Sequence, residues 1–413
     1  MILKISCTAL ILLSLVSVSS SANELIVVNG TAETLSRIDL ETGQVDNDFI
    51  QLGLVPNQVI CRDNFAYVIN STSADLYIIA LENDSLIAEI DLGSGTNPWY
   101  GAFIDDSLML VTNFVANTLS KVDTKNHVLL ESYPIGLRPQ GILVSENSSF
   151  ITLNEFDPAD TTYGQGRLAK WDNSGDSILV QVNIGKNPQD LALDSDGELY
   201  VLCSGNYVDI PAYIYVVDST NLTVVDSFYC ASVANTPNDI AVVSGHSGFL
   251  AGGGWFGNGQ VFTFDAHSNQ MLHDENNPLL TSTGVISVVP ATDSTIFTAN
   301  FYADYITELD SAGTIYNAYP VGDGPLSMAV NVVEPEPDYV CGDANSDESV
   351  DVSDAVYIIN FAFAGGTPPD PIESGDANCD SSVDVSDAVY IINYSFAGGN
   401  QPCDSDGDGE ADC

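Results

Sequence analysis

The chain has 413 residues, and its 57 acidic against 9 basic side chains give a formal net charge of −48. Such a charge repels phosphate backbones and anionic lipid, so nucleic acid and membrane surfaces are disfavoured as partners. An acidic surface of this kind suits either solubility in a saline habitat or the capture of calcium.

Residues 1–22 have the pattern of a secretory signal peptide. Lys4 precedes an apolar run from Ile5 to Val18, and small residues follow as far as Ala22. The run is shorter than the roughly 20 apolar residues of a membrane span, and no second such stretch follows. We therefore expect an extracellular protein, secreted or associated with the cell surface, without membrane insertion.

Residues 23–333 are predicted to form an all-β domain, because short strands rich in Val, Ile, Leu and Tyr alternate there with Gly, Asn, Asp and Pro. A proline that precedes an apolar strand recurs every 41 to 49 residues. The instances are Pro56, Pro98, Pro139, Pro188, Pro237, a degenerate one near Gly284, and Pro325. This spacing is the length of a four-stranded propeller blade. We predict a mainly β protein with a seven-bladed β-propeller, six blades being the alternative.

The ring is expected to close by combining its two ends. Residues 24–52 supply only three strands, and residues 326–330 can supply the fourth, which would leave no open sheet edge. In six of seven units the third strand ends in Asp, and we expect this carboxylate to accept backbone N–H groups of the following hairpin. The series is Asp39, Asp123, Asp172, Asp218, Asp265 and Asp310, with Ala80 as the exception.

Three second strands carry a recurrent four-residue pattern that ends in Asn. They are Tyr67-Val68-Ile69-Asn70, Leu110-Val111-Thr112-Asn113 and Phe297-Thr298-Ala299-Asn300. The pattern resembles the signature of YVTN-type propellers, which occur in surface-layer and periplasmic proteins. The resemblance implies a fold and says little about a ligand.

A ligand site is expected on the face where the loops between strands 2 and 3 emerge. Three such loops, 154–166, 204–211 and 252–259, are long and belong to consecutive blades, and Asp190 and Asp239 should share their face. Aromatic and polar side chains of this kind suit a glycan or a protein ligand, although each aromatic could instead pack between blades. The candidates are Trp99, Tyr100, Tyr163, Tyr207, Asp209, Trp255 and Phe256.

No catalytic arrangement is evident in the sequence. The histidines His127, His246, His267 and His273 lack metal-ligand spacing, and there is no Gly-x-Ser-x-Gly motif. We therefore favour a non-catalytic binding protein. The alternative is a propeller enzyme, such as a lyase, lactonase or glycan hydrolase, that belongs to a polysaccharide-degrading assembly.

After an acidic, Pro-containing linker at 334–340, one segment occurs twice. Residues 342–366 and 375–399 are identical at 21 of 25 positions. Each copy places oxygen ligands at positions 1, 3, 5, 7, 9 and 12 of a twelve-residue loop, the arrangement of an EF-hand calcium loop. The predicted ligands of two Ca²⁺ ions are Asp343, Asn345, Asp347, Ser349, Asp351 and Asp354, and Asp376, Asn378, Asp380, Ser382, Asp384 and Asp387.

Each loop leads into a short amphipathic helix that ends at Gly-Gly. The apolar side chains are Val356, Tyr357, Ile359 and Phe363, and Val389, Tyr390, Ile392 and Phe396. A duplicated calcium loop followed by one helix resembles a type I dockerin, the module that binds cohesin-bearing scaffolds, over residues 341–402. The resemblance implies a small all-α module and a cohesin-like partner, or self-association.

The chain departs from the dockerin pattern in two ways. Position 6, which is usually Gly, is Glu348 or Ser381, and the basic pair usual in cellulosomal dockerins is absent. The partner is therefore expected to contact a neutral surface. Its predicted residues are Val352, Ser353, Asn360, Val385, Ser386 and Asn393.

The acidic tail at 403–413 begins a third, incomplete calcium loop. Asp404, Asp406 and Asp408 are its predicted ligands, and the lack of a position-12 ligand predicts weak binding. Four cysteines around the module allow three disulfide pairings. Because Cys341 and Cys403 bracket the module, we expect these two to pair.

Overall fold

The computed structural model describes residues 22–243, 246–252, 258–291, 295–333, 339–380 and 382–403. Contacts divide the chain after Val333: one compact unit spans Ser21–Val333, and the C-terminal segment from Glu334 belongs to a second. Each unit has its own hydrophobic core. No helix within the described ranges is long and apolar enough to cross a membrane.

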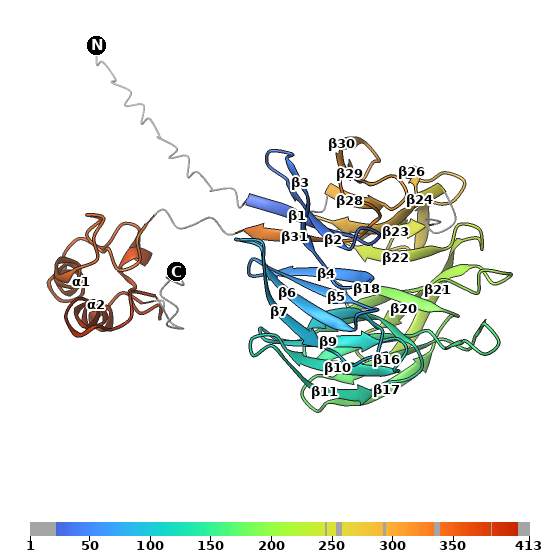
Figure 1. Ribbon diagram of the computed structural model, residues 1–413, viewed down its shortest axis with the longest axis horizontal. Coiled ribbons are helices and arrows are strands. Elements are labelled where there is room, and N and C mark those ends of the chain that lie inside the picture. Colours follow the sequence, from blue (N-terminus) through green and yellow to red (C-terminus); the bar gives the residue numbers. More distant parts are fainter. Residues whose placement is uncertain are drawn as a thin grey trace, which may run out of the picture. The chain divides into compact units, whose positions relative to one another are not determined.

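The larger unit is a β-propeller of seven antiparallel sheets (Figure 1), as the repeat spacing predicts, and not the six-bladed alternative. The first three blades contain β1 (Ala22–Asn29), β2 (Thr34–Asp39) and β3 (Val45–Gln51); β4 (Pro56–Arg62), β5 (Phe65–Asn70), β6 (Asp75–Ala80) and β7 (Ser85–Asp91); and β8 (Pro98–Phe103), β9 (Leu108–Asn113), β10 (Thr118–Asp123) and β11 (Val128–Pro134).

The next two blades contain β12 (Pro139–Ser145), β13 (Ser148–Leu153), β16 (Arg167–Asp172) and β17 (Ser177–Asn183); and β18 (Pro188–Leu193), β19 (Glu198–Cys203), β20 (Ala212–Asp218) and β21 (Thr223–Ala231). The last two contain β22 (Pro237–Val242), β23 (Ser247–Gly252), β24 (Asn258–Asp265), β25 (Gln270–His273) and β26 (Leu280–Thr283); and β27 (Val285–Pro290), β28 (Thr295–Asn300), β29 (Tyr305–Asp310) and β30 (Ile315–Pro320). A small hairpin, β14 (Phe156–Asp157) with β15 (Thr162–Tyr163), extends a loop of blade 4.

The ring closes through strand β31 (Pro325–Val333), which pairs antiparallel with β1 from Ala22 to Asn29. The strand order β3-β2-β1-β31 makes β31 the innermost strand of blade 1. The predicted closure by residues 326–330 is therefore confirmed. Both ends of the domain are held in one sheet, and β1 is hydrogen-bonded on both sides, to β2 and to β31.

Asp residues end the third strands and hold the hairpins that follow. Asp39 Oδ1 accepts the N–H of Thr42 at 2.8 Å, and Asp265 Oδ1 accepts that of Ser268 at 2.8 Å. These hydrogen bonds favour the ionised form, so the pKa of both carboxyls lies below its usual value. The predicted structural role of the Asp series is confirmed.

The Asn that ends the second strand also has a structural role. Asn70 Nδ2 donates to Asp75 Oδ1 at 2.8 Å, and Asn113 Nδ2 donates to Ser120 Oγ at 2.8 Å. Both asparagines are fully buried. They tie the second strand to the third across the turn, which accounts for the recurrent Asn in the pattern of Tyr, Val and Thr.

The smaller unit contains helix α1 (Val352–Ala364), the 3₁₀ turn η2 (Ile372–Gly375) and helix α2 (Val385–Ala397). Its core consists of the small or branched side chains Ala344, Ala355, Ile358, Ala377, Ala388 and Ile391. This corrects the expected apolar face: Val356, Ile359 and Phe363 are exposed, as are their counterparts on α2. The helices pack through Ala355 and Ala388, because small side chains allow a close approach, and this leaves the larger apolar side chains outside.

Candidate calcium loops and propeller channel

In the first predicted calcium loop, the chain folds around its leading carboxylate. Asp343 Oδ1 accepts the N–H of Asp347 at 3.0 Å, and Asp343 Oδ2 accepts that of Glu348 at 2.8 Å. In the second loop, Asp376 Oδ1 accepts the N–H of Asp380 at 3.1 Å. Glu348 has φ of 67°, the left-handed conformation expected at position 6, which costs a non-glycine residue roughly 1 kcal/mol.

Positions 9 and 12 join each loop to its helix. Asp351 is the N-cap of α1, with Oδ1 accepting the N–H of Ser353 at 2.7 Å, and the Asp354 side chain accepts the N–H of Asp351. Asp384 and Asp387 form the same capping box on α2. Such boxes satisfy the free N–H groups of the first helical turn. The loop geometry and the start of each helix are therefore fixed together.

The electrostatics of both loops fit a divalent cation. Asp354 and Asp387 are fully buried. Burial is the main cause that raises the pKa of each carboxyl, and neighbouring loop carboxylates act in the same direction. The last basic residue of the chain is Lys186, so no Lys or Arg can neutralise these acids from within the module. Asn345 Oδ1 is buried without a hydrogen-bond partner among the described residues. An all-oxygen set of this kind suits Ca²⁺.

The second loop is cross-linked by a disulfide between Cys379 and Cys403. The expected pairing of Cys341 with Cys403 is therefore wrong, although Cys341 is also disulfide-bonded. The Cys403 N–H donates to the Ala377 carbonyl at 2.9 Å, which holds the end of the module beside the second loop, within reach of Cys379. Cys61, Cys203 and Cys230 are free thiols of the propeller.

The predicted partner-binding residues lie on the exposed side of the helices. Val352 is 43% and Val385 44% exposed, and Asn360 and Asn393 are exposed as well. The hydroxyl of Ser353 is already engaged, since it donates to Asp351 Oδ1 and accepts from Asn345 Nδ2, and Ser386 repeats this arrangement. The serines therefore support the loops, whereas the valines and asparagines are free to meet a partner.

On the propeller, a cavity of about 240 Å³ lies where the first strands of all seven blades begin. Trp99 and Tyr100, two of the candidate ligand residues, both line it. Trp99 also packs on Phe114, with 5.3 Å between ring centroids. The remaining polar lining consists of Asn57, Gln58, Gln140, Gln189, Asp190, Asn238, Asp239, Ser287 and Ser327.

Of the other predicted ligand residues, some lie next to the cavity and others do not. The Tyr207 hydroxyl accepts a hydrogen bond from Nε2 of Gln189, which lines this cavity, called the channel below. Tyr163 packs against Tyr207 with 6.0 Å between ring centroids. Asp209 accepts a hydrogen bond from Asn206 Nδ2 at 2.7 Å and so supports its own loop. Trp255 and Phe256, like the third-loop ligands Asp404, Asp406 and Asp408, lie outside the described residues.

Asp190 and Asp239 form a carboxyl pair in the channel. Burial, and then the charge of Asp239 and a hydrogen bond with its carboxyl, raise the pKa of Asp190 well above its usual value. Each also binds the next blade: Asp190 Oδ2 accepts the N–H of Ile240 at 3.4 Å, and Asp239 Oδ2 that of Val288 at 2.8 Å. The sequence placed both on one face, but their contact depends on blade geometry and could be anticipated only from their identical offset after Pro188 and Pro237.

Comparisons with known proteins bear on both the propeller and the C-terminal module. Residues 341–396 match the dockerin type I domain model. No curated protein matches the chain significantly.

Among solved structures, hydrazine synthase of Kuenenia stuttgartiensis is similar at 12% identity and TM-score 0.55, covering 66% of this chain and 89% of that chain. A protein of unknown function from Desulfotomaculum acetoxidans is similar at 15% identity and TM-score 0.55, covering 76% and 100%. A quinoprotein alcohol dehydrogenase-like protein from Bacteroides thetaiotaomicron has 14% identity and TM-score 0.52, covering 75% and 78%. At such identities the likeness concerns the fold alone. The chain thus combines a seven-bladed β-propeller with a C-terminal dockerin type I domain.

Proposed function

We propose that this is an exported, non-catalytic binding protein whose propeller recognises a glycan or a protein. In this proposal the dockerin domain, over residues 341–402, attaches it to a cohesin-like partner outside the cell or at its surface. The signal peptide at 1–22 supplies export, and the linker at 334–340 separates the two functions. Two Ca²⁺ ions, held by the predicted oxygen ligands, keep the docking module folded.

The observation that carries the proposal is an exposed apolar stripe that occurs once on each helix. On α1 it consists of Val352, Val356, Ile359 and Phe363, which are 43%, 51%, 38% and 73% exposed. Their counterparts on α2 are Val385, Val389, Ile392 and Phe396, at 44%, 51%, 37% and 73%. Large apolar side chains this exposed on a small module mark a protein-binding surface.

The near-identical exposures support a module that presents two equivalent surfaces. A partner that binds one helix can therefore use either copy, or the stripe of a second chain can take its place. Because the stripes and the nearby Asn360 and Asn393 carry no charge, we expect an uncharged partner site. Binding should then depend little on ionic strength.

The propeller's share of the function rests on its channel. Trp99 offers an aromatic face at the cavity, and Asn238 Oδ1 lines it without a hydrogen-bond partner among the described residues. The amides of Gln140 and Gln189, which hydrogen-bond to each other at 3.3 Å, add further polar groups to the lining. This combination suits the hydroxyl groups and the apolar face of a sugar, or a peptide side chain. A glycan array probed with the mature protein tests this, with Trp99→Ala expected to lose binding. Tyr316→Ala, on the outer strand β30 and 56% exposed, is the control expected to retain it.

One observation favours a second candidate, a propeller enzyme. The paired carboxyls of Asp190 and Asp239 lie in a polar cavity, and one of them has a raised pKa, as general acids do. The test is a panel of lactones and polysaccharides. Turnover of any of these compounds by the wild type, abolished in Asp190→Asn, would establish this alternative. Binding without turnover supports the non-catalytic protein.

The docking role is tested by capture of the mature protein on immobilised cohesin domains. Val356→Asp with Phe363→Asp alters one stripe without touching a calcium loop, and Val389→Asp with Phe396→Asp alters the other. Either pair alone should leave capture nearly unchanged, and all four changes should abolish it, with calcium-induced helicity retained as the control for folding. Complete loss from one pair would contradict the two-surface proposal, while sedimentation in calcium separates self-association from cohesin binding.

A further inference from the structure

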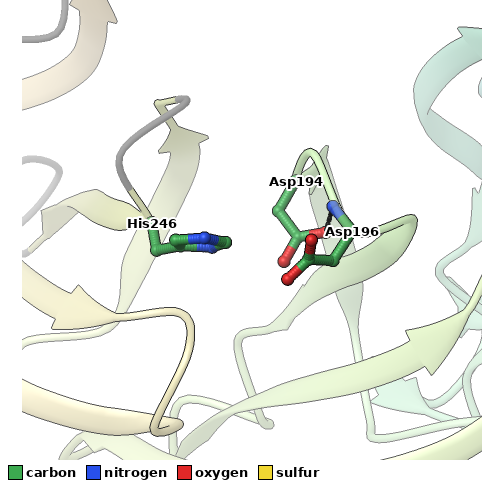
Figure 2. A group of neighbouring side chains, drawn as sticks. All are labelled: Asp194, Asp196 and His246. Atoms are coloured by element: carbon green, nitrogen blue, oxygen red, sulfur yellow. Dashed lines mark hydrogen bonds between the residues drawn. The ribbon is translucent and has the colours of Figure 1, made fainter.

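A group of three side chains that could bind a metal ion lies beyond the end of strand β18, whereas the cavity residues Gln189 and Asp190 lie near its start. Asp194 and Asp196 belong to the hairpin between β18 and β19, and His246 to the corresponding hairpin between β22 and β23 of the next blade. One ligand atom of each residue lies within 4.8 Å of the others. Figure 2 shows the imidazole ring of His246 pointing toward the two carboxylates.

The histidine has an unused ligand atom. His246 Nδ1 is buried and has no hydrogen-bond partner among the residues that the structure describes. A buried polar atom without a partner costs free energy, roughly 1–3 kcal/mol, and so calls for a ligand. The ring packs at 5.8 Å from that of His267, which does not supply a hydrogen bond to Nδ1.

The carboxylates also lack a cationic partner. Asp194 is only 8% exposed, and its Oδ1 is used by the N–H groups of Asp196 at 3.0 Å and Glu198 at 2.9 Å. Asp194 Oδ2 meets the Tyr200 hydroxyl at 3.4 Å, but the single proton of that hydroxyl also has the Ala266 carbonyl as a closer acceptor. No ion pair to these carboxylates occurs within the described ranges.

The surrounding backbone fixes the group across two blades. The Tyr200 hydroxyl of blade 5 donates to the Ala266 carbonyl of blade 6, and the Ala266 N–H donates to the His246 carbonyl at 2.8 Å. This chain of contacts holds the hairpin of blade 5 against that of blade 6. Partners behind the ligands that fix their orientation in this way are characteristic of metal sites.

From this geometry we propose that Asp194, Asp196 and His246 bind a divalent transition-metal ion, with Zn²⁺ as the first candidate. One imidazole nitrogen and two carboxylate oxygens are ligands that zinc accepts, at three of its usual four positions. The nitrogen ligand distinguishes the site from the all-oxygen calcium loops, because imidazole favours zinc and related metals over calcium. The bound ion joins blades 5 and 6 and adds stability to the ring.

The test is a calorimetric titration of the full mature chain with Zn²⁺, in excess Ca²⁺ so that the dockerin loops are filled. One zinc should bind per chain, and zinc should raise the unfolding temperature of the propeller. His246→Gln should weaken zinc binding by about 100-fold or more and remove the thermal shift. Asp196→Asn, at an exposed turn position, should weaken it in the same direction.

His127→Gln is the matched control, because His127 is also a hairpin histidine but is exposed and lies in blade 3, far along the chain from this group. It should bind zinc as the wild type does. Unfolding of His246→Gln and of the wild type is also compared in chelator. Equal stability without metal shows that the variant lost zinc binding and not its fold. Absence of a zinc site in the wild type, equal affinity in His246→Gln, or equal weakening by His127→Gln would each overturn the proposal.

Discussion

Removing strand β31 should unfold the propeller, whereas removing everything after it should not. Met328 is 5% exposed and packs with Leu25 and Val27, while Leu326 and Val330 pack partly buried against the same cluster. A fully buried side chain of this kind contributes about 1.5–3 kcal/mol, and each backbone hydrogen bond between β31 and β1 about 0.5–1.5 kcal/mol, so the strand as a whole contributes on the order of 10 kcal/mol. That equals most of the stability of a typical domain, which is about 5–15 kcal/mol.

Urea unfolding followed by tryptophan fluorescence can compare a chain that ends at Val333 with one that ends at Gly324. The first should unfold with the midpoint of the intact propeller, and the second should show no cooperative transition. A point-mutant pair refines the test: Met328→Ala should cost about 2–5 kcal/mol, whereas Val332→Ala, 52% exposed on the same strand, should stay within about 0.5 kcal/mol. Equal midpoints for the two truncated chains would refute the closure argument.

Three further predictions concern the loops and the channel. Circular dichroism of residues 338–413 should show helix that forms with calcium and disappears with chelator, and equal helicity in both would contradict metal-dependent folding. Calorimetry should count two strong calcium sites, and a third of equal affinity would contradict the weak binding predicted for Asp404, Asp406 and Asp408. The pKa of Asp190 is raised in the folded protein, so the folded state binds a proton on this carboxyl more tightly than the unfolded state does. The protonated carboxyl therefore stabilises the fold fully below the usual pKa of 3.8, and this stabilisation is lost as the pH rises through the raised pKa. Asp190→Asn should therefore gain stability relative to the wild type as the pH is raised above about 4 in urea unfolding, and a difference independent of pH would contradict this.

The sequence predicts those features of the fold that repeat. Pro188 and Pro237 mark the first strands of their blades because the same local geometry recurs, and Asp265 ends a third strand because a hairpin needs its carboxylate. A repeat also makes an incomplete first unit visible, which is why β31 could be anticipated. The calcium loops follow from spacing alone, since their ligands lie within twelve residues.

The sequence does not predict features that depend on contacts between residues far apart in the chain, or on which of two apolar helix faces is buried. Helix α1 is apolar on more than one side, so periodicity could not show that Ala355 packs inside while Phe363 remains outside. The partner of Cys403 depends on how the chain returns to the second loop. Asp194 and His246 are 52 residues apart and meet only because adjacent blades place equivalent hairpins side by side.

We expect the chain to dock to its partner through the calcium-loaded dockerin domain and its neutral stripes. Titration of the mature protein into a purified cohesin, with calcium and with chelator and at about 0.05 and 0.5 M salt, tests it most directly. Binding should be saturable in calcium, change little with salt and be lost in chelator. Binding that persists in chelator, or that falls steeply as salt is raised, would contradict it.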